Sequence, residues 1–180
     1  MAYALRLFRG PASRPRRSAP ADASPWGGGA ILFENLEARK YFHLEWTPDL
    51  ASYLDAPIGE AKGQTTFELL ILFLALVVWG VRYRSTGLAL LGDNLSALAE
   101  AVSLKGQHGL AKINREISWR KVRLGWRYGV AHLPSEMNFL ADALSRLSAP
   151  AGSDRKVFPA ALSQAKAVQP PSVVDLWACK

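Results

Sequence analysis

Apolar positions in the first half of the chain change from a two-residue alternation to one long block. Residues 26–35 indicate a glycine-rich turn followed by a short strand, and residues 39–46 alternate as its hairpin partner would. Residues 64–83 are apolar and free of proline, which predicts a helix with Thr65 or Thr66 as its N-cap. The pattern therefore predicts two antiparallel strands followed by a buried helix.

The second half alternates shorter apolar runs with helical periodicity. The predicted elements are a strand over 87–91, helices over 95–104 and 109–128, a strand over 130–132 and a helix over 137–147. With a further strand that ends near Asp22, the order is strand, strand, strand, helix, strand, helix, helix, strand, helix. This order predicts an α/β fold with helices packed on a mixed sheet.

Four carboxylates interrupt or end apolar stretches that would otherwise be plain core: Asp22, Glu68, Asp93 and Asp142. An ionised group in such a place is costly unless a positive charge lies beside it. Asp22 and Asp93 are expected at carboxyl ends of strands, where ligand sites gather in α/β sheets. The acids can therefore converge on a metal.

Carboxylate oxygens suit Mg²⁺, and two such ions about 3.5–4 Å apart hydrolyse phosphodiesters in many enzymes. A softer metal is not indicated, because His43, His108 and His132 are scattered and Cys179 is remote. The expected cofactor is a pair of Mg²⁺ ions, for which Mn²⁺ could substitute.

Length and charge narrow the class of protein. A chain of 180 residues is large enough for one domain with tails, and its net charge of +7 favours a polyanionic partner such as nucleic acid. The single cysteine excludes an intrachain disulfide and favours a reducing compartment. The most apolar run, residues 69–79, is shorter than the about twenty residues that span a bilayer, so no membrane partner is expected.

Composition changes at two places and predicts three segments. Residues 1–16 form a flexible basic lead-in, residues 17–149 the working domain, and residues 150–180 a flexible tail rich in proline, alanine and serine. The arginine-rich start resembles a transit peptide in composition, but its prolines leave no amphipathic helix. A cytoplasmic or nuclear location is expected, and the oligomeric state is left open.

Four segments together resemble the ribonuclease H domain of retroelement reverse transcriptases, above all of DIRS and gypsy-like elements. They are ADASPWGGGAIL, TTFELLILFLALVVW, LLGDNLSALAEAVSLKG and VAHLPSEMNFLADALSRL, within residues 18–147. The resemblance implies a ribonuclease H-like fold with a five-stranded mixed sheet and helices on both faces. It also implies cleavage of the RNA strand of RNA–DNA hybrids, and a reverse transcriptase domain as a neighbour in a larger polyprotein.

The resemblance also assigns roles to individual residues. Asp22, Glu68, Asp93 and Asp142 match the four metal ligands, and His132 matches a histidine that assists proton transfer or product release, with Asn138 between His132 and Asp142. Contact with nucleic acid is further expected of Ser24 and Trp26 beside the glycine turn, and of Asn94 and Asn138.

The predicted helix over 109–128 has a basic stripe beside its apolar one. Lys112, Arg115, Trp119 and Arg123 recur at three- and four-residue spacing and could neutralise phosphates and stack on a base or sugar. The alternative is a solvated helix in which Trp119 and Trp126 belong to the core.

Structural interpretations compete with the catalytic one. Asp93 could cap the helix that begins at Leu95, Glu68 could complement a helix dipole in the first turn, and Gly27, Gly28 and Gly29 predict a tight turn rather than a nucleotide loop. The first strand is also poor in strand-forming residues and contains Pro20, which removes a ladder donor. A catalytically decayed domain that still binds nucleic acid is therefore the alternative function.

Overall fold

The computed structural model describes residues 17–177. The predicted basic lead-in over residues 1–16 and Cys179 lie outside these residues. The strands are β1 (Arg17–Ala23), β2 (Gly27–Glu34), β3 (Glu37–Glu45), β4 (Leu88–Gly92), β5 (Tyr128–His132) and β6 (Lys166–Ala167). The α-helices are α1 (Pro48–Leu54), α2 (Gln64–Trp79), α3 (Leu95–Ser103), α4 (His108–Leu124), α5 (Phe139–Ser145) and α6 (Val173–Leu176).

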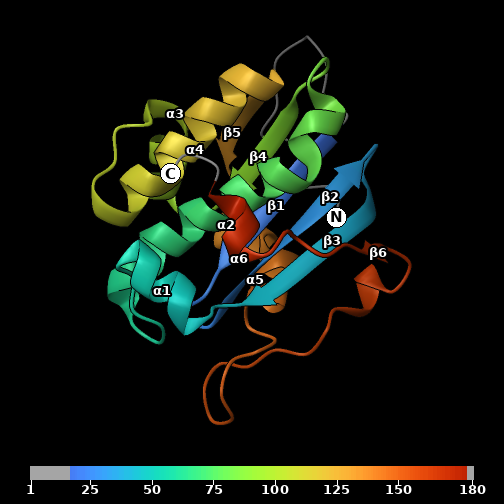
Figure 1. Cartoon of the computed structure of the whole chain (residues 1–180). Helices are drawn as coiled ribbons and strands as arrows, with labels where there is room; N and C mark the ends of the chain where they lie inside the picture. Colours follow the sequence, from blue (N-terminus) through green and yellow to red (C-terminus); the bar gives the residue numbers. More distant parts are fainter. Residues whose placement is uncertain (1–16, 178–180) are drawn as a thin grey trace.

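The strands form one mixed sheet in the order β5-β4-β1-β2-β3-β6 (Figure 1). β1, β2 and β3 are antiparallel neighbours, whereas β4 and β5 run parallel to β1. The predicted α/β class and mixed sheet are confirmed. The predicted count of five strands is short by one, because the two residues of β6 pair in parallel with Lys40 and Tyr41 of β3.

β1 lies in the middle of the sheet despite its weak strand propensity. Its ladder with β2 is interrupted at Ala19 and Pro20, while Pro20 is paired in register with Leu91 of β4. Because proline has no backbone N–H to donate, the interruption leaves no broken hydrogen bond in the ladder at Pro20. Packing between two strands and two helix layers therefore overrides the propensity of this segment, and the strand continues through Asp22.

The three glycines belong to β2 and not to the turn before it, which corrects the prediction of a glycine turn. A Cβ at Gly29 would lie 2.3 Å from Leu144 Cβ, and one at Gly28 would lie 2.6 Å from the indole of Trp46. Glycine is needed here because α5 and the core approach the strand from its two faces.

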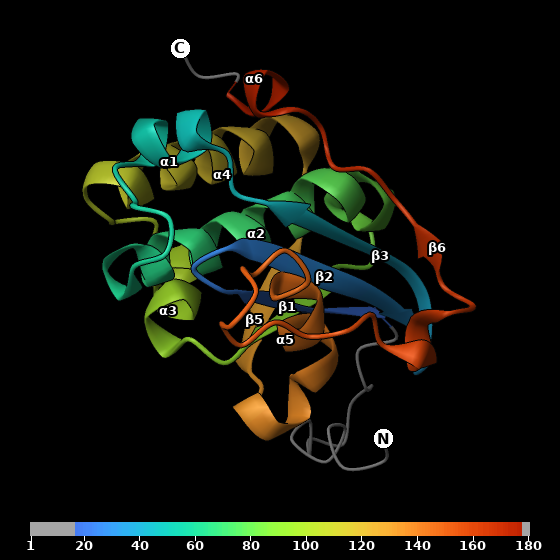
Figure 2. The ribbon, with the colours of Figure 1, turned by 90° about the horizontal axis from the view of Figure 1, so that it is seen from below.

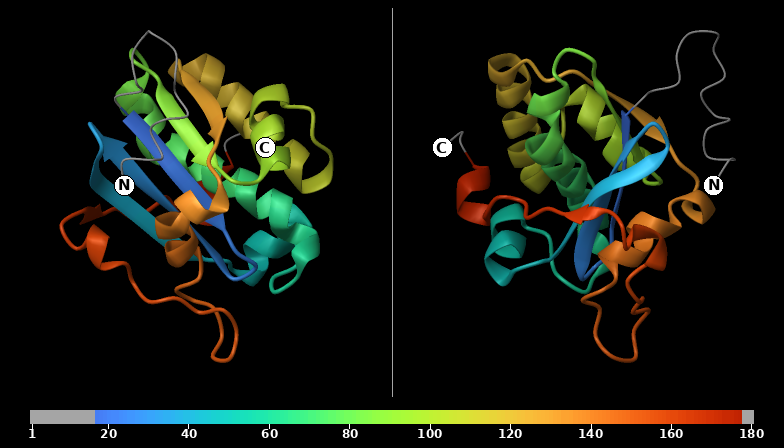
Figure 3. Two further views of the ribbon diagram at one scale, coloured as in Figure 1. Left: turned by 180° about the vertical axis from the view of Figure 1, so that it is seen from behind. Right: turned by 90° about the vertical axis from the view of Figure 1, so that its right-hand side faces the viewer.

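Helices cover both faces of the sheet, as predicted (Figures 2 and 3). α2 packs on β1, β2 and β4, and α3 lies beside it against β5. α4 packs on α2, and α1 packs on α4. α5 packs on the opposite face against β1, β2 and β3. A large cluster of buried side chains lies on the α2 face, and a smaller one around Ile31, Leu140 and Leu144 lies on the α5 face.

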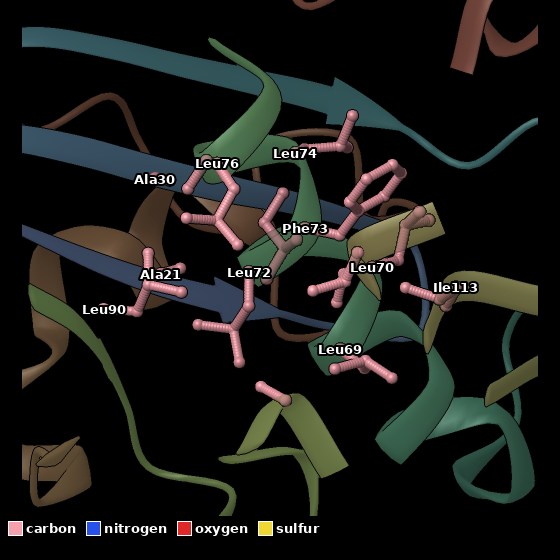
Figure 4. Close-up of a cluster of buried hydrophobic side chains, with 14 of the residues drawn as sticks. Ala21, Ala30, Leu69, Leu70, Leu72, Phe73, Leu74, Leu76, Leu90 and Ile113 are labelled. Atoms are coloured by element: carbon pink, nitrogen blue, oxygen red, sulfur yellow. The ribbon is translucent and has the colours of Figure 1, made fainter. Parts of the chain in front are cut away.

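α2 is the centre of the large core (Figure 4). Leu69, Leu72 and Phe73 point in different directions from the helix and are all buried, with sheet residues such as Leu90 on one side and α4 on the other. A helix that is apolar all round has to be buried all round, so the sequence of α2 determines its central position.

The start of α2 differs from the prediction. The helix begins at Gln64, its N-cap is Gly63, and no side chain caps it, so neither Thr65 nor Thr66 has that role. Glu68 consequently lies beyond the first turn, which removes the proposed role as a dipole partner there.

A helical stretch that includes α2 is longer than its most apolar run. Among the described residues, Ala61–Tyr83 is long and apolar enough to cross a membrane by length and composition. The length of the apolar run alone therefore does not distinguish a membrane helix from a buried core helix. In the fold 67% of its most apolar window is buried, which is how the core helix of a sheet is placed. This helix also carries Glu68.

The segment after α5 follows the surface of the domain and contacts it at several points. Leu162 is buried in the smaller cluster, and Trp177 packs against the ring of Tyr53 at 4.6 Å between centroids. A nitrogen of the Arg120 guanidinium donates to the backbone oxygen of Leu176 at 2.8 Å. The division into a domain and a flexible tail stays a prediction.

Candidate metal centre

Three of the four predicted acids come together at one edge of the sheet. Asp22 lies near the end of β1, Asp93 directly follows β4, and Glu68 is on α2, which packs on both strands. One carboxylate oxygen from each lies within 4.8 Å of the other two. The parallel pairing of β1 with β4 explains this, because it brings the carboxyl ends of both strands to the same edge.

Two of these acids are deeply buried. Asp22 is 4% exposed and Glu68 is 5% exposed. Burial raises the pKa of Asp22 to about 7, with the neighbouring charges of Asp93 and Asp142 adding to the rise and a hydrogen bond from Ser145 opposing it. Burial, and then the charge of Asp22, raise the pKa of Glu68 well above its usual range. A divalent cation would favour the ionised forms of both.

Neutral donors orient the buried acids. Ser145 Oγ donates to Asp22 Oδ2 at 2.6 Å, and Asn138 Nδ2 donates to the backbone oxygen of Ala21 at 3.0 Å and lies 3.5 Å from Asp22 Oδ1. Gln64 Nε2 donates to Glu68 Oε1 at 3.1 Å. These bonds hold the carboxylates in place without supplying the compensating charge.

The residues beside the buried acids also keep acceptors that pair with nothing among the described residues. Asn138 Oδ1 and Gln64 Oε1 are both buried and have no hydrogen-bond partner there. A buried oxygen without a partner is unfavourable, and oxygen is the ligand atom that Mg²⁺ and Mn²⁺ bind. The donor set of the site therefore fits a hydrated divalent cation.

Asp93 is not a helix cap. The cap of α3 is Asn94, whose side chain accepts from the backbone nitrogen of Ala97 at 3.0 Å. Asp93 instead accepts a hydrogen bond of 2.7 Å from Ser135 Oγ. The structural interpretation of Asp93 as a cap is therefore wrong, and its carboxylate faces the other acids.

Asp142 stands apart from the three clustered acids. Its Oδ1 accepts at 2.6 Å from Nε of Arg146, the residue that directly follows α5. Ser145 Oγ lies 2.6 Å from Asp22 Oδ2 and 2.9 Å from the backbone oxygen of Asp142, so Asp142 lies beside the same site. The structure thus gathers three of the predicted ligands directly and holds the fourth against an arginine.

His132 is exposed at the end of β5, at the same edge as the acids. It is paired in register with Gly92, and the backbone nitrogen of Leu133 donates to the oxygen of Gly92 at 2.8 Å. Gly92 is the residue before Asp93, so the histidine and the site are on neighbouring strand ends. Its role in proton transfer stays a prediction.

The residues predicted beside the turn have structural contacts of their own. The Ser24 hydroxyl is buried, accepts from the backbone nitrogens of Trp26 and Gly27 and donates to the backbone oxygen of Ser145 at 2.7 Å. Ser24 thereby links the β1–β2 turn to the helix that carries Asp142. Contact of Ser24, Trp26, Asn94 and Asn138 with nucleic acid stays a prediction, which burial makes harder for Ser24 and Asn138.

Some residues of the basic stripe on α4 are exposed, and one contacts α1. Trp119 is 37% exposed with the guanidinium of Arg123 over its ring at 5.2 Å, and Arg115 is exposed, whereas Trp126 is buried in the core. Lys112 donates to the backbone oxygen of Tyr53 and lies 4.3 Å from the centre of its ring. Arg115, Trp119 and Arg123 are thus the exposed residues of the basic stripe that was predicted to contact nucleic acid.

Sequence reasoning missed four polar residues of the site. Gln64 and Arg146 stand four residues from Glu68 and Asp142 in the sequence, which is a readable i,i+4 spacing. Ser135 and Ser145 bond to acids 42 and 123 residues away in the chain, so no local pattern marks them.

No protein-family model matches the chain, and no curated protein is significantly similar to it in sequence. Solved structures are similar in three dimensions. Ribonuclease H1 from the archaeon Halobacterium salinarum NRC-1 has a TM-score of 0.55 at 19% identity, covering 74% of this chain and 96% of the archaeal one. The N-terminal ribonuclease H domain of a Mycobacterium tuberculosis protein has a TM-score of 0.53 at 17% identity, covering 73% and 91%. The chain therefore has the ribonuclease H fold.

Proposed function

We propose that this protein is a metal-dependent endonuclease that hydrolyses the RNA strand of RNA–DNA hybrids. The observation that carries the proposal is the convergence of Asp22, Glu68 and Asp93 within 4.8 Å, at the edge where β1 and β4 end in a ribonuclease H fold. Buried acids with raised pKa values are typical of functional sites, and a bound cation would favour their ionised forms.

The chain's own residues would hold two divalent ions between them. Asp22 and Glu68 provide the buried ligands, Asp93 provides an accessible one, and Asp142 completes the set from α5. When bound, the ions supply Lewis-acid stabilisation of the charge that develops on the phosphate. His132, on the neighbouring strand end, is the residue placed to take up or return a proton.

Nucleic-acid binding would rest on shape and charge. A ribonuclease H of this kind selects the hybrid through its 2′-hydroxyls and its helix geometry rather than its sequence. Arg115, Trp119 and Arg123 offer phosphate and stacking contacts, so neutralising the two arginines would flatten the salt dependence of binding. The quoted sequence segments support a retroelement origin with a reverse transcriptase neighbour, and that origin favours a cytoplasmic or nuclear location.

The second candidate is a decayed domain that binds nucleic acid without cutting it. The observation that favours it is the pairing of Asp142 with Arg146, which occupies one of the four predicted ligands.

A cleavage assay separates the two candidates. The chain, its Asp93→Asn variant and an Asp49→Asn control in exposed α1 are incubated with end-labelled RNA–DNA hybrid in Mg²⁺ or Mn²⁺. Cutting by the parent and the control, lost by at least about a hundredfold in Asp93→Asn, is the expected result for a metal ligand. Hybrid binding without cutting, at excess protein and with either metal, would favour the decayed domain.

A further inference from the structure

Arg146 lies between two carboxylates that belong to different parts of the chain. Its Nε donates to Asp142 Oδ1 at 2.6 Å, and its Nη1 lies 3.2 Å from Asp154 Oδ2. Lys156 approaches the other oxygen of Asp154 at 2.9 Å. One guanidinium is therefore shared between a predicted metal ligand and an acid outside the metal site.

The segment that carries Asp154 is anchored to the end of α5. The backbone nitrogen of Lys156 donates to the oxygen of Arg146 at 3.4 Å, and Arg155 Nε donates to the oxygen of Leu147 at 3.1 Å. These bonds hold Asp154 beside Arg146 whether or not Arg146 stays on Asp142.

A metal ion and Arg146 compete for the negative charge of one carboxylate. The guanidinium on Asp142 Oδ1 neutralises the Asp142 carboxylate, and the strength of a charge-assisted hydrogen bond has to be overcome to free it. Asp154 lowers that barrier, because Arg146 can leave Asp142 without losing all of its negative partners.

We propose that Arg146 is a positioning residue that passes from Asp142 to Asp154 when a divalent cation enters the site. Asp142 is thereby neutralised while the site is empty and becomes a ligand only as the cation arrives. The inference rests on the proposed function, since it takes Asp142 as one of the metal ligands.

The passage of Arg146 from Asp142 to Asp154 predicts opposite effects of two substitutions on the affinity for Mn²⁺. Arg146→Gln removes the competitor, so it should tighten binding of Mn²⁺ about three- to tenfold. Asp154→Asn removes the alternative partner and leaves Arg146 on Asp142, so it should weaken binding by a similar factor. General electrostatics would give the same signs, so a second background is needed.

The Asp142→Asn background supplies that distinction. If Arg146 acts through Asp142, both substitutions should lose their effect on Mn²⁺ binding when position 142 is already neutral, whereas a long-range charge effect would persist. Arg39→Gln, which removes the same charge from an exposed arginine that pairs with Glu37 and with no acid of the site, serves as the matched control and should change binding less than Arg146→Gln.

The test is calorimetric titration of the full chain and each variant with MnCl₂, beside melting temperatures in the absence of metal. Opposite changes in Kd that vanish in the Asp142→Asn background support the exchange. A lower melting temperature of Arg146→Gln with unchanged Kd, or effects that persist with Asn at position 142, would overturn it. Absence of Mn²⁺ binding by the parent chain would overturn the proposed function as well.

Discussion

The four carboxylates form two pairs with different surroundings. The inner pair, Asp22 and Glu68, is buried and hydrogen-bonded by neutral groups, and its pKa values are raised. The outer pair, Asp93 and Asp142, is partly exposed and already has a hydroxyl or a guanidinium as partner. A bound cation would therefore stabilise the inner pair most, because the outer pair already has polar or charged partners.

The largest expected difference between the pairs is in how strongly each makes the free energy of unfolding depend on pH. The pKa of Asp22 is about 7 in the fold, against an ordinary value of 3.8. An acid with a raised pKa stabilises the fold relative to the unfolded chain only while protonated. The contribution of Asp22 to the free energy of unfolding should thus fall as the pH rises from about 4 and level off above about 7. The loss from Asp22 alone is at most about 4 kcal/mol.

Asp22→Asn should remove the Asp22 contribution to that pH dependence and stabilise the metal-free protein at pH 8, while abolishing cleavage. Asp142→Asn should not stabilise it, because Arg146 would lose its ion pair. Urea unfolding between pH 4 and 8 measures both. A parent protein whose metal-free stability is unchanged over this range would remove the distinction between the pairs.

A change at Gly29 should disturb both pairs together. Alanine there would push its Cβ to within 2.3 Å of Leu144 and force α5, which carries Ser145 and Asp142, away from the sheet. We expect a loss of about 1–3 kcal/mol in stability and weaker Mn²⁺ binding.

Gly129→Ala in β5 is the matched control, because a Cβ there meets nothing within 4 Å. Melting temperatures measure the loss of stability in both variants, and MnCl₂ titrations measure the change in Mn²⁺ binding. Equal, small effects at the two glycines would show that α5 adapts without moving the acids.

The smallest expected difference is between the stability losses caused by removing the two serine hydroxyls that bond to Asp22 and Asp93. Ser145→Ala removes the bond that lowers the pKa of Asp22, so that pKa should rise further and stability at pH 8 should fall by about 1 kcal/mol. Ser135→Ala removes an exposed bond to Asp93 and should cost less. Carboxyl titration by NMR in both variants gives the measurement, and an unchanged Asp22 titration in Ser145→Ala would contradict it.

Much of the fold could be predicted because its strongest signals are local. The apolar block of α2, the run before Asp93 and the periodicity of α3 and α4 each determine one element. α1 was missed although Thr47 and Pro48 mark its start, with the Thr47 side chain accepting from Leu50. β6 has only two residues and no apolar pattern, so only pairing with β3 makes it a strand.

The candidate site was predictable in its acids and less so in their partners. Asp22 and Asp93 were expected together because they follow strand ends that meet at one edge, whereas Glu68 was assigned to the site by the resemblance of its segment. The sharing of Arg146 between Asp142 and Asp154 depends on the path of the chain after α5, which composition does not determine. The three glycines were assigned to a turn because their real constraint, contact with Leu144 and Trp46, exists only in the fold.

β6 has a consequence for self-association. It pairs with β3 at Lys40 and Tyr41, on the side of β3 away from β2. Open backbone groups on an outermost strand are a template for a second chain, and intermolecular pairing of this kind leads to aggregates. The short strand after α5 blocks that template over two residues, so a shortened form that ends before Lys166 would have a greater tendency to polymerise through β3.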